Sequence, residues 1–201
     1  MVAIAVVVGG LTAAFLIFAP FHHENQPAVT QQASPPVAAP PSSATASPSS
    51  VSARQQAAES LAALLQKSVA DRSAIAQTVT DVNQCGPNLN QDPSVFEAAA
   101  TSRQNLLGQL ASLSGRSALP PGMLAVLTSA WQNSIAADQD FAEWARDEIA
   151  NGCTPDDQSD PGAQAAVGPD DRATTSKESF VQMWNPVAAQ YGLPAYQWNQ
   201  L

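Results

Sequence analysis

Three charged residues interrupt otherwise apolar stripes in this sequence, and they are its best candidates for a binding site. Arg72, Arg103 and Asp138 each occupy a position where spacings of three and four residues place apolar side chains on one helix face. A buried charge requires a partner, so we expect Asp138 to pair with Arg72, with Arg103 or with both. Such a pair can fix helix register. Alternatively, two guanidinium groups against one carboxylate leave a positive charge that can hold a small anion.

Carboxylate pairs are the remaining candidates for catalysis. Asp140 with Glu143, and Asp147 with Glu148, are neighbours on the polar side of one predicted helix. Most such pairs are solvated surface groups, so we expect the chain not to be an enzyme. An enzyme that acts on cell-wall polymer with a carboxylate pair is the alternative.

Histidine occurs only at His22 and His23, an adjacent pair that we interpret as solvated. Ser-His-Asp and Cys-His catalysis and histidine-based zinc sites are therefore excluded from the rest of the chain. The acidic loop 154–171 lacks the glycine and glutamate spacing of an EF-hand. We expect no cofactor and no metal, with weak calcium binding at this loop as the alternative.

The overall composition restricts the possible partners. Lys and Arg total eight, the net charge is −9, and no basic run occurs. Nucleic acids and anionic membrane surfaces are therefore unsuitable partners for the soluble part of the chain.

The N-terminal residues 2–19 carry no charge, and on a helix they would extend about 27 Å, close to the thickness of a bilayer core. We expect residues 1–20 to form an uncleaved transmembrane anchor. A cleaved signal peptide is the alternative, although its apolar region is usually shorter. The first basic residue after the span is Arg54, which favours an extracytoplasmic location for the remainder.

Residues 21–50 are rich in Pro, Ala and Ser and contain few large apolar residues. Such a segment cannot bury enough surface to offset its ordering entropy, so we expect a disordered linker. Residues 51–201 then form the extracytoplasmic domain.

Four amphipathic stretches in that domain predict helices over about 52–82, 92–113 and 119–150, and from near 171 to Tyr191. Pro186 should kink or split the last of these. No stretch alternates long enough to predict a strand. The fold class is therefore all-α, an up-down four-helix bundle. The last predicted helix and the C-terminus carry an aromatic cluster that we expect to pack on the core: Phe180, Trp184, Tyr191, Tyr196 and Trp198.

Cys85 and Cys153 are the only cysteines, and each follows a predicted helix. In an up-down bundle both lie at the same end, so outside the cytosol they should form a disulfide. Closing a 68-residue loop stabilises the fold by about 4 kcal/mol in the chain-entropy model. Two free thiols are the alternative.

Residues 55–201 resemble an uncharacterised group of membrane-anchored extracytoplasmic helical domains from high-GC Gram-positive bacteria. The likeness is carried by Asp71-Arg72, Cys85-Gly86, Ala130-Trp131, Ser134, Ala137-Asp138, Trp144-Ala145, Cys153, Phe180, Trp184-Asn185-Pro186 and Tyr191-Gly192-Leu193-Pro194. The resemblance implies the location and a paired Cys85–Cys153. The group has no assigned activity, so no functional residue carries over.

These observations predict a membrane-tethered extracytoplasmic binding or sensor module. Its partner would be an extracytoplasmic protein, a wall fragment or a small anionic ligand. A structural spacer without a ligand is a further alternative.

Overall fold

The computed structural model describes residues 48–157 and 159–201. The predicted anchor (1–20) and residues 21–47 of the predicted linker lie outside this range. The described chain contains α1 (Pro48–Asn83), α2 (Asp92–Ala111), α3 (Met123–Asn151) and α4 (Pro161–Tyr191), with short 3₁₀ helices η1 (Arg116–Ala118) and η2 (Trp198–Gln200). The described residues form no strand, so the all-helical prediction is confirmed. None of these helices is both long and apolar enough to span a membrane.

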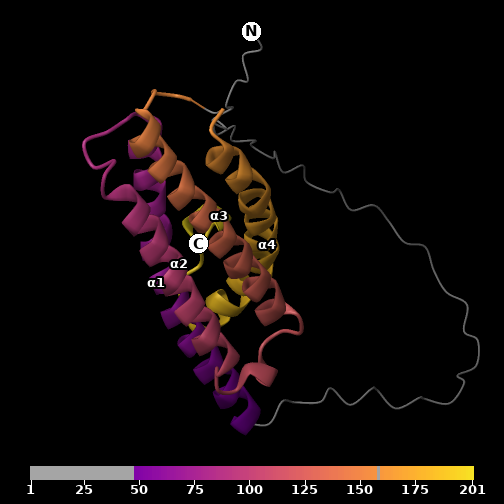
Figure 1. Cartoon of the computed structure of the whole chain (residues 1–201). Coiled ribbons are helices and arrows are strands. Elements are labelled where there is room, and N and C mark those ends of the chain that lie inside the picture. Colours follow the sequence, from indigo (N-terminus) through magenta and orange to yellow (C-terminus); the bar gives the residue numbers. More distant parts are fainter. Residues whose placement is uncertain (1–47, 158) are drawn as a thin grey trace, which may run out of the picture. The chain divides into compact units, whose positions relative to one another are not determined.

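The four long helices run alternately up and down (Figure 1). The predicted disulfide is confirmed: Cys85 and Cys153 are bonded, with their Cα atoms 5.7 Å apart, at the end where α1 meets the α1–α2 loop and α3 meets the α3–α4 loop. A second link lies beside it, since the Asn83 carbonyl accepts a hydrogen bond from the Asp156 amide at 2.8 Å. The two loops at this end are thus joined covalently and by hydrogen bonding.

The start of α4 differs from the prediction. The helix begins at Pro161, ten residues before the predicted start, because the Asp160 side chain accepts hydrogen bonds from the amides of Gly162 and Ala163. This is N-capping, and proline suits the first helical position. The helix then continues through Pro169 and Pro186. Of the two expected effects of Pro186, the split therefore does not occur, and the kink stays a prediction.

Two apolar cores lie along the bundle, one towards each end. The core nearer the disulfide centres on Phe96, Trp144 and Ile75. The larger core, towards the opposite end, includes Trp131 and Trp184. Charged residues described in the next section lie between these two cores.

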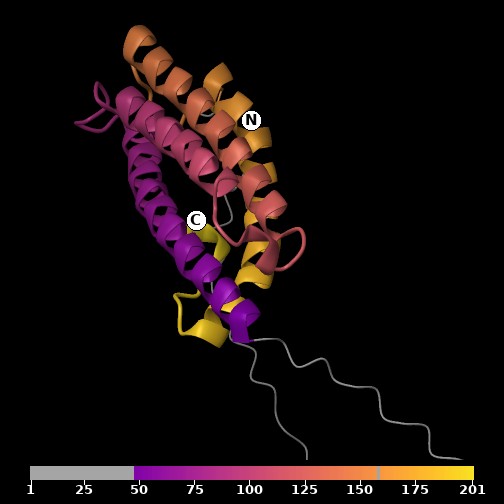
Figure 2. The same ribbon diagram turned by 90° about the horizontal axis from the view of Figure 1, so that it is seen from below.

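The C-terminal segment packs against the larger core, which confirms most of the expected aromatic packing. Figure 2 shows this segment folding back beside α4 and α1. The Trp184 indole donates a hydrogen bond to the Pro194 carbonyl at 2.9 Å, and Leu201 is fully buried. Trp198 begins η2, which contacts α4 and α1, but 39% of its surface remains exposed. Ile149, near the end of α3, is also exposed, at 40%.

Candidate functional site

A buried charged layer separates the two cores, and it contains two of the three residues expected from the sequence. Arg103 on α2 and Asp138 on α3 form an ion pair and are 1% and 2% exposed. Lys177 on α4 lies in the same region and is 4% exposed. Arg72 on α1 is half-buried, and Asp138 pairs with Arg103 rather than with Arg72 among the described residues.

Interhelical hydrogen bonds explain why these residues meet. They join Lys67 to Gln109, Ser68 to Trp131, Ser129 to Ser176 and Asn133 to Arg172. Along the antiparallel helices α1 and α2, five residues from the Lys67–Gln109 pair bring Arg72 to the level of Gln104, next to Arg103. The ion pair with Arg103 then brings in Asp138 from α3. Lys177 on α4 is linked to this layer by electrostatics, since the charges of Arg103, Arg72 and Asp138 all act on its ammonium group.

Burial sets the protonation behaviour of the layer. It raises the pKa of Asp138 to about 6, because desolvation outweighs the opposing effect of the Arg103 and Lys177 charges. Burial, together with the charges of Arg103 and Arg72, lowers the pKa of Lys177 to about 8. The negative charge of Asp71 raises the pKa of Asp138, and that of Asp170 raises the pKa of Lys177. Three cations therefore face three carboxylates, and the layer is close to electrically balanced.

This layer is closed rather than open to a ligand. Arg72, Arg103 and Asp138 line none of the main hollows on the described surface. Their binding role therefore stays a prediction, and their position favours the register-fixing interpretation. Sequence reasoning missed Lys177, although it lies four residues after buried Ala173 and three before buried Phe180. That apolar stripe was the available signal.

The charged residues are strongly segregated along the bundle. We define the cysteine half as residues 73–102 and 139–171, on the disulfide side of the charged layer, and the tail half as residues 48–72, 103–138 and 172–201. The cysteine half contains twelve Asp and Glu residues and a single Arg. The tail half contains four Asp and Glu residues and seven Lys and Arg residues. One end of the domain is therefore acidic and the other weakly basic.

The predicted carboxylate pairs do not form a catalytic arrangement. Glu148 is buried and accepts hydrogen bonds from the Trp144 indole at 3.2 Å and the Thr154 amide at 3.3 Å. Asp140 and Asp147 are half-buried and Glu143 is exposed, all on α3. None of these four residues lines the main hollows of the described surface.

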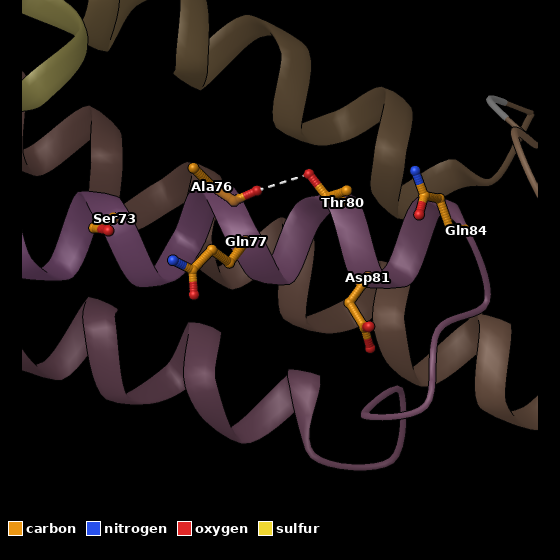
Figure 3. Close-up of a pocket in the computed structure, with 6 residues that line it drawn as sticks. All are labelled: Ser73, Ala76, Gln77, Thr80, Asp81 and Gln84. Atoms are coloured by element: carbon orange, nitrogen blue, oxygen red, sulfur yellow. Dashed lines mark hydrogen bonds between the residues drawn. The ribbon is translucent and has the colours of Figure 1, made fainter.

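A different carboxylate pair, not expected from the sequence, joins α1 to α2. Burial, together with the charge and hydrogen bond of Asp81, raises the pKa of Asp92 to about 6. Asp92 is the first residue of α2 instead of its N-cap, which is Gln91. Figure 3 shows Asp81 at a hollow lined by side chains of α1 and by Gln84, the residue that follows this helix. Because Asp92 is buried, only one carboxyl of the pair faces that hollow.

A second hollow in the cysteine half is mainly apolar, and we call it the α1–α4 groove. It has a volume of about 200 Å³ and is lined by Val79, Asn83, Phe141, Trp144, Ala163, Val167, Asp170 and Asp171. The Phe141 and Trp144 rings lie 6.3 Å apart on α3. Val167, on the α4 side, is 58% exposed. The groove thus combines aromatic and aliphatic walls with two aspartates.

Comparison with known proteins identifies no relative: no family model, curated protein or solved structure matches this chain significantly. The functional argument therefore rests on the geometry and charge distribution of the chain itself.

Proposed function

We propose that the chain is a membrane-tethered, extracytoplasmic binding or sensor module whose cysteine half recognises a cationic segment of another protein. The observation that carries this proposal is the charge segregation, with twelve acidic residues and one Arg in the cysteine half. A surface of one charge sign attracts partners of the opposite sign and accelerates their association. The same charges disfavour a small anion or an anionic wall fragment at this end.

Tethering and location come from the sequence outside the described residues. The uncharged segment 2–19 supports an anchor, and the Pro-rich segment 21–47, before α1, supports a linker that lets the domain reach a partner. The disulfide in the described part is compatible with an oxidising compartment. The resemblance to membrane-anchored extracytoplasmic helical domains supports the same location.

The enzyme alternative has one observation in its favour, the Asp81–Asp92 pair. Two carboxyls that share a proton can act as acid and base. Here, however, Asp92 is buried, and the hollow beside Asp81 is lined by side chains of α1 and Gln84 but not by Asp92. We therefore place the binding module first and retain the spacer as the outcome if no binding occurs.

The proposal is tested with the full-length chain in detergent micelles and a labelled Lys-Lys-Ser-Lys-Lys peptide, by fluorescence anisotropy at low and high salt. Glu143→Gln with Asp171→Asn neutralises two exposed charges of the cysteine half, and Glu59→Gln with Glu178→Gln is the matched control in the tail half. Surface charge pairs contribute about 0.2–1 kcal/mol each, so the first variant should bind at least about twofold more weakly while the control is unchanged. Absence of salt-sensitive binding, or equal effects of both variants, would contradict the proposal.

A further inference from the structure

We infer that the α1–α4 groove receives one apolar side chain of the cationic partner, so that the preferred partner is a Lys/Arg-rich segment with an aliphatic or aromatic residue among its charges. This inference rests on the proposed function, because it specifies the partner of the same acidic half. It adds a specificity that charge attraction alone does not provide.

The groove walls supply the apolar part of the argument. Phe141, Ala163 and Val79 are only half-buried, and Val167 is one of three large apolar residues that are exposed in the described chain. Of those three, Val167 is the one that lines a main hollow of the described surface. An incoming apolar side chain would remove these walls and its own surface from water, which is favourable in proportion to the area buried.

Size and charge specify the occupant. Sites for drug-sized molecules usually measure about 300–1,000 Å³. The groove, at about 200 Å³, is smaller and suits a single side chain. Asp170 and Asp171 lie in its lining, and the surrounding cysteine half carries a large acidic excess. Cations on either side of the inserted residue would therefore meet carboxylates, whereas an acidic or purely apolar segment would not.

The floor of the groove is rigid enough to discriminate between side chains. Trp144 is buried, and its indole nitrogen already donates to Glu148 at 3.2 Å. Phe141 packs against Phe96, with ring centroids 5.5 Å apart. These aromatic rings are held by contacts within the domain, so the groove is formed before a partner arrives.

The test compares Lys-Lys-Leu-Lys-Lys with Lys-Lys-Ser-Lys-Lys on the full-length chain, again by anisotropy. The leucine peptide should bind about tenfold more tightly, because burying its side chain adds to an identical charge attraction. Ala163→Leu fills the groove and should remove this preference. Ala165→Leu makes the same substitution at an exposed position of α4 outside the groove and should leave the preference intact.

A second groove variant keeps the test informative if Ala163→Leu does not fold. Val167→Ser changes an exposed side chain, and it should reduce the preference for leucine while Ala165→Ser does not. Equal affinity of the two peptides, or a leucine preference that survives both groove variants, would overturn this inference while leaving the proposed function standing. Failure of both peptides to bind would instead overturn the proposed function.

Discussion

Replacing Arg103 and replacing Asp138 should destabilise the bundle by different amounts, although both substitutions break the same buried ion pair. Arg103 is 1% exposed and Asp138 2% exposed, so neither partner can turn to solvent. A stranded carboxylate can take up a proton, whereas a guanidinium group remains charged at every ordinary pH. After Arg103 is replaced, the remaining Asp138 can become neutral, whereas after Asp138 is replaced, the remaining Arg103 stays charged.

The pKa of Asp138 limits the cost of Arg103→Met. Protonating a carboxyl with an unfolded-state pKa of 3.8 costs about 4 kcal/mol at pH 7, which is the ceiling for this group. About 3 kcal/mol of that is already present, because the folded pKa is about 6. Loss of the Arg103 charge therefore adds only about 1 kcal/mol through Asp138, and lost hydrogen bonding brings the expected total to about 1–2 kcal/mol.

The free-energy cost of Asp138→Leu is not limited by protonation in this way. It leaves Arg103 buried without its partner and close enough to Lys177 for their charges to repel. Removing one member of a buried pair typically costs about 3–5 kcal/mol. In the double variant Arg103→Met with Asp138→Leu both members are apolar, so stability should return to within about 1 kcal/mol of the original chain.

Urea unfolding of the full-length chain, followed by circular dichroism at pH 7, measures these differences. The reasoning predicts the order Asp138→Leu least stable, Arg103→Met intermediate, and the double variant most stable of the three. If Arg103→Met is as destabilising as Asp138→Leu, or if the double variant is the least stable, the account of a closed, register-fixing layer is wrong.

Three further predictions concern stability. Cys85→Ser with Cys153→Ser opens a 68-residue loop and should lower the unfolding free energy by about 4 kcal/mol in urea titrations, and an unchanged midpoint would contradict the stabilising role of the disulfide. The folded-state pKa of Asp138 lies above its unfolded value, so the stabilisation linked to its protonation is full below pH 3.8 and is lost as pH rises through about 6. Stability should accordingly gain about 1 kcal/mol from this group between pH 7 and pH 5, a gain that Asp138→Leu removes, as paired urea titrations would show. Gly162→Ala should lower the melting temperature, because its Cβ would lie 2.6 Å from a backbone nitrogen of α3, whereas Gly108→Ala, with nothing within 4 Å, should raise it slightly.

The helices and the disulfide were predictable because their signals are local. Spacings of three and four residues mark the buried faces, and Gly152 and Gly192 mark helix ends with positive φ values of 84° and 65°. Both cysteines then fall at one end through simple up-down connectivity. These inferences needed no knowledge of how the helices pack against one another.

The start of α4 was missed for a different reason. Residues 161–170 contain Pro161, Gly162, Gly168 and Pro169, a composition typical of loops. In the structure Gly162 instead permits close packing against α3, and Asp160 caps the helix. Tertiary contact at a small residue thus outweighed an unfavourable local propensity.

The site was only partly predictable. The sequence predicted that Asp138 pairs with Arg72, with Arg103 or with both, and the structure has the pair with Arg103. The burial of Lys177 in the same region was not predicted. The α1–α4 groove depends on how three helices approach one another, which no sequence spacing encodes. The charge segregation was present in the sequence, but it became visible only once the helices had been sorted into two halves.

A cross-linking map would test the recognition model most directly. A Lys-Lys-Leu-Lys-Lys peptide with a photoreactive leucine analogue is irradiated with the full-length chain, and the attachment sites are read by mass spectrometry. The model predicts attachment within residues 73–102 and 139–171, concentrated around Val79, Ala163 and Val167. Attachment mainly within residues 48–72, 103–138 or 172–201 would contradict it.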